Sequence, residues 1–338
     1  MHEKDDNGRR KYMIFDMHCD TLYRIRTQRE KGKDVSLRDG GILFVNLEQM
    51  KKSDYGLQNF AVFIDKEERE SPYEDAMELV GIFEEEMRKN SDLVRQVCSA
   101  SEISDNRREG KMSAMLTLEE GAMCEGDPEK LKEFYNHGAR MMTICWNYEN
   151  ELGYAAACQA EGTYGRTVER TYGLKKKGFV FLEEMEHLGM IPDVSHLSDD
   201  GFFDVCRICK KPFVASHSNA RAVCAHRRNL TDEMLHALGD HGGVAGLNFC
   251  PEFVSLEQER SALLDALAEH AVHMIRFGGR ECVGIGSDLD GFRGESAPRN
   301  AQDMDALVWA LHRKGLTESE IDGILWKNVM RVYQEVLG

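Results

Sequence analysis

Long apolar runs are missing from this sequence. None of its apolar segments approaches the roughly 18 residues that a membrane-spanning helix requires. The N-terminal stretch MHEKDDNGRRKY is highly charged, and no apolar core of a signal peptide follows it. Internal repeats, low-complexity tracts and a proline-rich linker are missing too. We therefore expect a cytoplasmic protein with a single domain, residues 1–338, and no membrane partner.

Basic residues are also in short supply. The chain has 43 Lys and Arg against 59 Asp and Glu, which gives a formal net charge of −16. An acidic surface repels the phosphates of nucleic acids and of anionic lipids. We therefore expect no nucleic acid as a partner.

The cysteines lack an arrangement that would hold a structural zinc ion. The chain has 10 of them, but the pair Cys206-x-x-Cys209 has no second pair at zinc-finger spacing. Without secretion they should stay reduced, and several should behave as small buried hydrophobes. Cys19 stands between two candidate metal ligands, and we assign it no chemistry.

What the sequence does contain is a regular alternation of short apolar runs and longer amphipathic stretches. The runs that we interpret as strands are residues 12–17, 59–64, 112–118, 139–145, 190–194, 213–216, 243–248 and 282–286. Nearly continuous apolar runs are typical of parallel strands buried on both faces, and strands that alternate with helices indicate an α/β fold. Eight such units favour a closed (β/α)8 TIM barrel over an open sheet.

Most of these strands are separated by segments with a helical pattern. The clearest are residues 73–97, 128–137, 174–188, 199–209 and 258–277. Two stretches fit the repeat poorly and are interpreted as an insertion after the first strand (about 21–58) and a long loop after the fourth (about 147–173). Residues 318–337 are expected to form one or two helices on the outside of the barrel.

Residues able to bind a metal follow one predicted strand after another. In a (β/α)8 barrel the active site lies at the carboxyl ends of the strands. The residues found there are His18 and Asp20, Glu119 or Glu120, His196, His217 and Asp288. Imidazole and carboxylate groups suit zinc and similar divalent metals, and this set is large enough for two ions.

Strand geometry narrows some of these choices. His18 and Asp20 are two residues apart and should point to the same side. Glu119 and Glu120 should point in opposite directions, so only one can face the metals. A carboxylate can bridge two ions about 3.5–4 Å apart, which gives the inward-facing glutamate a function.

Four charged residues near the later strands keep more than one interpretation. Asp288 is placed to take a proton from metal-bound water, and Asp290 points the same way, although we prefer Asp290 as part of a turn. Arginine beside the sixth strand can hold a substrate carboxylate by two parallel hydrogen bonds. Arg227 and Arg228 can equally be solvated or paired with local acids.

Taken in order, these motifs resemble the membrane (renal) dipeptidase family of binuclear zinc peptidases, in its bacterial branch. The matching segments are Asp16-Met17-His18-Cys19-Asp20, Leu118-Glu119-Glu120-Gly121, Thr143-Ile144-Cys145-Trp146-Asn147, Asp193-Val194-Ser195-His196, Ser216-His217-Ser218, Arg227-Arg228-Asn229 and Gly286-Ser287-Asp288-Leu289-Asp290-Gly291. The resemblance covers essentially the whole chain. It implies a (β/α)8 barrel that hydrolyses dipeptides with a hydroxide held between two zinc ions per subunit.

The resemblance also implies a division of the metal ligands. His18 and Asp20 would bind one zinc ion, and His196 and His217 would bind the other. Glu119 would bridge the two, since it matches the first acid of the family's Glu-Gly-Gly stretch. The family often accepts a D-residue at the second position, and a homodimer is expected by the same resemblance.

The resemblance also implies roles in proton transfer and substrate binding. Asp288 would transfer protons as the acid–base residue, and Arg228 would hold the carboxylate of the dipeptide. The family member from animal kidney carries a histidine after the fourth strand, where it helps to polarise the scissile carbonyl, but this chain has Trp146. We expect Trp146 and Asn147 to contact substrate, and the oxyanion partner stays open between the metal, Asn147 and Asn150.

Two other functions remain as alternatives. One is a different binuclear-metal barrel hydrolase that acts on a non-peptide amide or an ester. Many of those use a carboxylated lysine as the bridge, and no lysine ends a predicted strand. The other, less favoured because the ligand set is complete, is a metal-binding protein without enzymatic activity.

Overall fold

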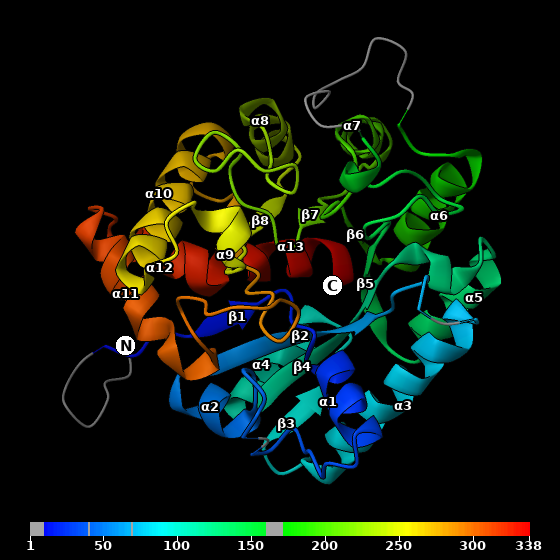
Figure 1. Cartoon of the computed structure of the whole chain (residues 1–338), viewed down its shortest axis with the longest axis horizontal. Helices are drawn as coiled ribbons and strands as arrows, with labels where there is room; N and C mark the ends of the chain where they lie inside the picture. Colours follow the sequence, from blue (N-terminus) through cyan, green and yellow to red (C-terminus); the bar gives the residue numbers. More distant parts are fainter. Residues whose placement is uncertain (1–9, 40, 69, 160–171) are drawn as a thin grey trace.

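Eight parallel strands close into a barrel in the computed structural model, which describes residues 10–39, 41–68, 70–159 and 172–338 (Figure 1). Around the ring the strands are β1 (Ile14–Asp16), β2 (Tyr55–Phe63), β4 (Met112–Glu119), β5 (Ala139–Thr143), β6 (Ile191–Asp193), β7 (Val214–Ala215), β8 (Val244–Leu247) and β9 (Val283–Ile285). The ring closes where Asp16 pairs with Ile285. Each strand overlaps one of the predicted apolar runs, so the predicted (β/α)8 barrel is confirmed.

Helices cover this ring around its side and, in the case of the C-terminal helix, across one end (Figure 1). They are α1 (Thr21–Glu30), α2 (Leu47–Lys52), α3 (Pro72–Lys89), α4 (Ala100–Arg108), α5 (Pro128–Asn136), α6 (Lys176–Leu188), α7 (Asp199–Ile208), α8 (Asp232–Asp240), α9 (Pro251–Val254), α10 (Arg260–Gly278), α11 (Met304–Arg313), α12 (Glu318–Asp322) and α13 (Asn328–Leu337). Several begin at a polar cap; for example, Ser99 and Glu102 form a reciprocal capping box at the start of α4.

The segment between the second and third strands of the ring differs from the prediction. A continuous helical pattern was expected over residues 73–97, but α3 ends at Lys89 and Asn90 caps it. The next residues form a short strand, β3 (Val94–Gln96), which pairs with the first residues of β4 outside the ring. The valines of this segment fit a strand as well as they fit a helix. A few closely spaced apolar residues do not distinguish the two-residue period of a strand from the 3.6-residue period of a helix.

The two stretches that fit the repeat poorly contain regular structure where they are described. Within residues 21–58, α1 and α2 are helices, and β2 already begins at Tyr55. In the long loop after β5, residues 156–158 form one turn of 3-10 helix, and residues 160–171 lie outside the described part of the chain.

The C-terminal helix α13 closes the end of the barrel opposite the carboxyl ends of the strands. Its residues Val329 and Tyr333 pack among inward-facing apolar residues from the strands of the ring, such as Phe15 and Met141. A Cβ at Gly284 would lie 2.9 Å from the side chain of Val244 and 3.0 Å from that of Val329, so the glycine allows α13 to pack closely against β9. The expectation of a helix on the outside is therefore wrong for α13, which seals the interior.

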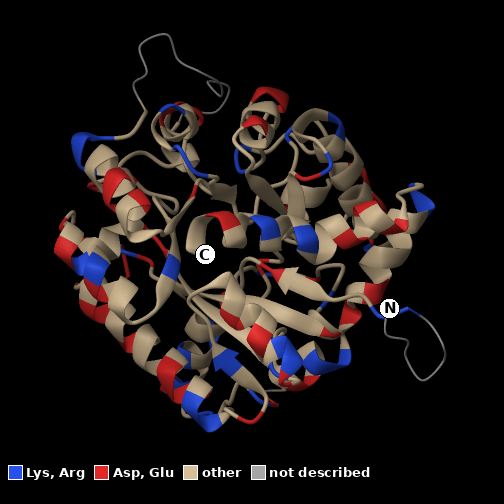
Figure 2. Ribbon diagram, turned by 180° about the vertical axis from the view of Figure 1, so that it is seen from behind, with Lys and Arg blue, Asp and Glu red and all other residues tan. Residues whose placement is uncertain are grey.

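The outer surface carries both signs of charge. In Figure 2, acidic and basic residues are interspersed along the outer helices. Within the described residues, we find no helix with the length and apolar character needed to span a bilayer.

Candidate metal centre

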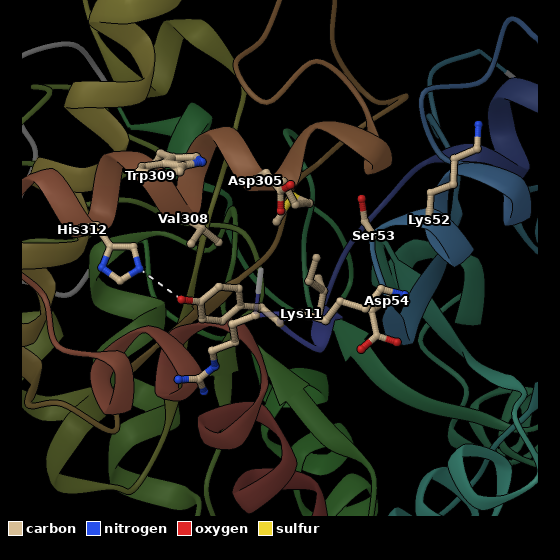
Figure 3. Close-up of a pocket in the computed structure, with 12 residues that line it drawn as sticks. Lys11, Lys52, Ser53, Asp54, Asp305, Val308, Trp309 and His312 are labelled. Atoms are coloured by element: carbon tan, nitrogen blue, oxygen red, sulfur yellow. Dashed lines mark hydrogen bonds between the residues drawn. The ribbon is translucent and has the colours of Figure 1, made fainter. Parts of the chain in front are cut away.

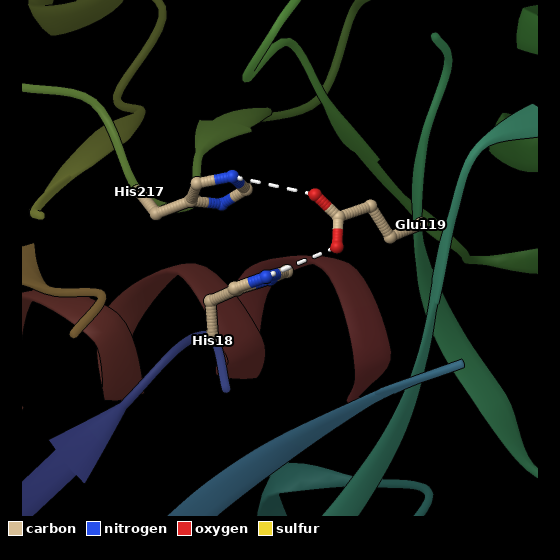
Figure 4. A group of neighbouring side chains, drawn as sticks. All are labelled: His18, Glu119 and His217. Atoms are coloured by element: carbon tan, nitrogen blue, oxygen red, sulfur yellow. Dashed lines mark ion pairs between the residues drawn. The ribbon is translucent and has the colours of Figure 1, made fainter. Parts of the chain in front are cut away.

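Five side chains meet at the carboxyl ends of the strands. Glu119 is the last residue of β4, and the other four lie in the loops after β1, β6 and β7: His18, Asp20, His196 and His217. At most 7% of any of these residues is exposed. Figure 4 shows the imidazoles of His18 and His217 directed at the carboxylate of Glu119. The fold therefore brings together all five residues that the sequence indicated as metal ligands.

The carboxylate of Glu119 lies between two groups of ligands. Its Oε2 is 3.2 Å from Nε2 of His18, which is itself 3.5 Å from Oδ2 of Asp20. Its Oε1 is 3.2 Å from Nε2 of His196 and 3.5 Å from Nε2 of His217. Each oxygen thus faces one group, which is the arrangement of a carboxylate that bridges two cations.

Unpartnered polar atoms indicate that this cluster binds an ion. Nε2 of His18, Oδ1 of Asp20 and Oε2 of Glu119 are buried and have no hydrogen-bond partner among the described residues. Burying such an atom unpaired costs about 1–3 kcal/mol. Ligand atoms of His18, Glu119 and His217 lie within 4.8 Å of one another, as do those of His18, Asp20 and Asp288. This donor set fits divalent zinc.

The electrostatics of the cluster also favour a cation. Burial lowers the pKa of His196 and of His217 well below the ordinary value, so both rings are neutral and keep a lone pair. Burial opposes protonation of His18, but Glu119 and Asp20 outweigh it and raise its pKa well above the ordinary value. Burial and Glu119 raise the pKa of Asp20 to about 6. A divalent cation would relieve this crowding of acidic groups.

Hydrogen bonds fix the outer nitrogens of two histidines. Nδ1 of His196 lies 3.1 Å from Oδ1 of Asn147. An amide oxygen only accepts, so Nδ1 carries the proton and Nε2 keeps its lone pair for the cluster. Nδ1 of His217 lies 2.7 Å from Oγ of Ser216, which donates its own proton to Asp193 at 2.5 Å. Such partners orient the imidazoles of metal sites.

Asp288 stands beside the first group of ligands. Its Oδ2 accepts a hydrogen bond from Nδ2 of Asn248 at 2.9 Å, and its backbone N–H donates to the carbonyl of His18 at 3.1 Å. Burial is the main reason why the pKa of Asp288 rises to about 8, and Asp20 adds to the effect. Gly291 permits the close packing, because a Cβ there would lie 2.0 Å from Oδ2 of Asp20.

The two acids that the sequence offered as alternatives have other partners. Asp290 accepts hydrogen bonds from Oγ1 of Thr21 at 2.8 Å and from the backbone of Phe44 at 2.9 Å. Glu120 accepts one from Nδ2 of Asn150 at 2.5 Å. Both carboxylates hold loops in place, and Asn150 is occupied by this contact.

Arg228 and Trp146 border the cluster on different sides. Arg228 is buried in the loop between β7 and α8 and donates to the carbonyl of His217 at 3.3 Å, while its Nε has no partner in the described part of the chain. It therefore has donor capacity for a carboxylate. Arg227 donates instead to the carbonyl of Ala157. The ring of Trp146 lies 6.1 Å from that of His196.

Sequence reasoning missed three buried polar residues of this site. Two of them are Asp193, which accepts from Ser216, and Asn248, which donates to Asp288. The third is Asp16, which accepts hydrogen bonds from the backbone of Ser287 at 2.9 Å and from its hydroxyl at 2.6 Å. Asp16 and Asp193 each end a ring strand shortly before a candidate ligand. An acid at the end of an apolar run was therefore the available signal, whereas nothing in the sequence distinguished Asn248.

A separate cavity of 440 Å³ lies at the amino ends of the first strands (Figure 3). It is lined by residues that include Tyr12, Asp54 and Trp309, and Tyr12 contacts His312 there. None of the candidate metal ligands lines this cavity. The cavity is therefore distinct from the metal centre, which lies at the opposite ends of the strands.

Sequence comparison identifies relatives along nearly the whole chain. The sequence profile described as membrane dipeptidase (peptidase family M19) matches residues 7–337. An uncharacterized dipeptidase of Schizosaccharomyces pombe is 29% identical over 95% of this chain and 80% of its own length. An uncharacterized protein of Klebsiella pneumoniae, encoded in the 5′ region of pqqA, is 32% identical over 72% of this chain and 89% of its own length.

Solved structures share the fold. A dipeptidase of family M19 superposes with a TM-score of 0.86 at 24% identity, covering 97% of this chain and 99% of that one. A Rhodobacter sphaeroides metallopeptidase, liganded with a phosphinate mimic of the dipeptide L-Ala-D-Ala, gives 0.85 at 23% identity, with 96% and 99% covered. A probable dipeptidase of Pseudomonas aeruginosa gives 0.81 at 19% identity, with 97% and 95% covered.

Proposed function

This chain belongs to the membrane dipeptidase family, peptidase family M19, and from that premise we propose that it hydrolyses L-Xaa-D-Xaa dipeptides with two zinc ions. Membership makes the protein a metal-dependent hydrolase of peptide bonds, as the family resemblance predicted. The L-Xaa-D-Xaa class is supported by the Rhodobacter sphaeroides structure, whose ligand mimics such a dipeptide.

The proposal of two zinc ions is based on the position of Glu119. One of its oxygens faces His18 and the other faces His196 and His217. A carboxylate that served a single ion would need only one of these groups. His18 with Asp20 would hold one ion, and His196 with His217 would hold the other.

The reaction divides between the metal and the chain. Two bound zinc ions would supply an activated water and polarise the scissile carbonyl. Asp288, oriented by Asn248, would hold a proton of the attacking water and deliver it to the leaving amine. The guanidinium of Arg228 would bind the C-terminal carboxylate. Asn150 donates from Nδ2 to Glu120 and to the carbonyl of Ile144, so it is not assigned to the oxyanion. Asn147 uses its Oδ1 toward His196, which leaves its Nδ2 as the candidate donor to the oxyanion.

The test compares two neighbouring glutamates. Wild-type protein should contain two zinc ions per chain by elemental analysis and should hydrolyse L,D-dipeptides in a panel that includes L,L-dipeptides, amides and esters. Glu119→Gln should lower the zinc content and abolish activity. Glu120→Gln, the matched control, should keep its zinc because Glu120 faces Asn150. Wild-type protein that binds no zinc, or that cleaves only non-peptide substrates, would contradict the proposal.

We also propose a cytoplasmic location and a homodimer. All 10 cysteines are free thiols, as expected in a reducing compartment, and the homodimer follows from the family resemblance. Cell fractionation tests the first. Light scattering tests the second, with a species of about twice the chain mass of 38.5 kDa as the expected result.

A further inference from the structure

Four aromatic side chains form a continuous wall next to the metal centre. The ring of Trp146, which neighbours His196, contacts Phe63 edge to face with centroids 4.8 Å apart. Phe63 in turn contacts Tyr23 at 5.2 Å, and Trp146 contacts Tyr148 at 5.6 Å. These residues come from β2, α1 and the loop after β5. We call them the aromatic wall.

The Phe63 end of the wall lies across the barrel from Arg228, whereas Trp146 and Tyr148 follow β5, two strands from β7. Phe63 ends β2, and Arg228 follows β7, and these strands are four positions apart in either direction around the ring of eight. They therefore occupy opposite sides of the barrel (Figure 1). A dipeptide whose carboxylate is bound at Arg228, and whose amide lies at the metal centre, directs its N-terminal residue toward the wall. Each extended residue spans about 3.3–3.6 Å, so the first side chain is the part of the substrate that reaches it.

The charges beyond the wall are mainly negative. The hydroxyl of Tyr23 donates to Glu68 at 3.2 Å, and Asp65 and Glu67 add to the negative potential around Tyr148. Two cations lie near the wall: Lys66 is 5.9 Å from the ring of Tyr148, and Arg26, which pairs with Asp75 at 2.6 Å, is 5.1 Å from the ring of Tyr23. An acidic substrate side chain would meet net repulsion here.

We infer that the aromatic wall selects dipeptides whose N-terminal residue has a large apolar side chain, above all an aromatic one. This inference rests on the proposed dipeptidase function. Trp146 and Phe63 would contact the faces and edges of such a side chain, and burial of its carbon atoms would favour binding. A methyl group would leave the wall largely uncovered, and a carboxylate would be repelled.

The experiment measures kcat/KM for Phe-D-Ala, Ala-D-Ala and Asp-D-Ala with the zinc-loaded enzyme. We expect Phe-D-Ala to exceed Ala-D-Ala by about tenfold or more, since even one methylene in an apolar site is worth roughly that factor. Asp-D-Ala should be the poorest substrate. The ratio between two substrates is internal to each preparation, so a loss of folded enzyme cancels from it.

Two variants and a matched control assign the preference to the wall. Trp146→Leu and the milder Phe63→Leu should each reduce the Phe-to-Ala ratio several-fold. Trp309→Leu makes the same chemical change at an exposed tryptophan on α11 and should leave the ratio unchanged. Equal rates for Phe-D-Ala and Ala-D-Ala, a preference for Asp-D-Ala, or a ratio that neither wall variant alters would overturn the inference. Hydrolysis of no dipeptide at all would instead contradict the proposed function.

Discussion

Replacing Asp193 by asparagine tests how the chain prepares His217 for a metal. Oδ1 of Asp193 accepts hydrogen bonds from the backbone of Ser195 at 2.9 Å and of Ser216 at 2.8 Å. Its Oδ2 accepts from Oγ1 of Thr143 at 2.6 Å and from Oγ of Ser216 at 2.5 Å. A carboxylate can satisfy all four donors because it only accepts.

The direction of these bonds determines which nitrogen of His217 carries the proton. Ser216 gives its single proton to Asp193, so its oxygen accepts Nδ1–H from His217, and Nε2 keeps a lone pair facing Glu119. In Asp193→Asn the side-chain amide would donate to Ser216. The hydroxyl would then donate to Nδ1, and the proton of the neutral ring would move to Nε2. A protonated Nε2 cannot bind zinc.

The expected loss of metal affinity concerns the ion that His217 would bind. Removing such an outer partner of a metal-bound histidine typically costs 10–100-fold in metal affinity, which corresponds to about 1.4–2.7 kcal/mol. The free energy of unfolding of the metal-free protein should fall as well, by about 1–3 kcal/mol, because the buried hydroxyl of Thr143 loses its acceptor.

A competition titration with a chromophoric chelator measures both zinc affinities, and urea denaturation measures the stability. Asp16→Asn is the matched control. Asp16 is equally buried and accepts from the hydroxyl of Ser287 at 2.6 Å and the backbone of His18 at 3.2 Å, with no imidazole nitrogen among its described partners. In Asp16→Asn we expect a loss of stability similar to that in Asp193→Asn, but a smaller loss of zinc affinity. Wild-type zinc affinity in Asp193→Asn, or equal losses in both variants, would refute the reasoning.

Three further predictions concern catalysis and the metal. Asp288→Asn should keep both zinc ions and lower kcat by about 10²–10⁴-fold, because it removes the proton carrier; wild-type kcat at unchanged zinc content would exclude that role. Arg228→Lys should raise the KM of dipeptides by about tenfold, since an ammonium group cannot make two parallel bonds to a carboxylate; an unchanged KM would place the carboxylate elsewhere. Chelation of the metal should lower the melting temperature, because free zinc at 1,000 times its Kd stabilises by about 4 kcal/mol; a thermal scan that zinc does not shift would contradict a buried metal centre.

Much of the fold and of the ligand set could be predicted because both depend on where apolar runs end. Strand alternation predicts that only one of Glu119 and Glu120 can face the metals, and the family resemblance selected Glu119, which ends β4, while Glu120 faces the loop amide of Asn150. The contact between Ser216 and Asp193 could not be predicted, since it depends on how β6 and β7 are aligned side by side. The alignment of neighbouring strands cannot be predicted from the spacing of residues along the sequence.

The places where prediction failed have similar causes. Residues 94–96 form a strand because the edge of β4 offers free hydrogen-bonding groups there, which is a tertiary effect that overrides a weak local pattern. The helix α13 was expected outside the barrel because an amphipathic pattern does not say which surface its apolar face meets. Val329 and Tyr333 are apolar or aromatic in either case, and only the fold shows that they face the barrel interior.

The apolar residues that stabilise the barrel and the polar residues of the metal centre lie at opposite ends of the barrel axis. At the amino ends of the strands, α13 closes a layer of inward-facing apolar side chains. At the carboxyl ends, buried acids are crowded together, and His196 and Asp288 adopt left-handed backbone conformations, with φ of 67° and 60°. Such conformations cost of order 1–3 kcal/mol each and persist only where the surrounding structure holds them. Local hydrogen bonds give that support: the carbonyl of His196 accepts from the backbone of Ala156 at 2.7 Å, and the backbone of Asp288 donates to the carbonyl of His18 at 3.1 Å. The polar end is therefore held in a strained form, rich in negative charge, that a cation would stabilise.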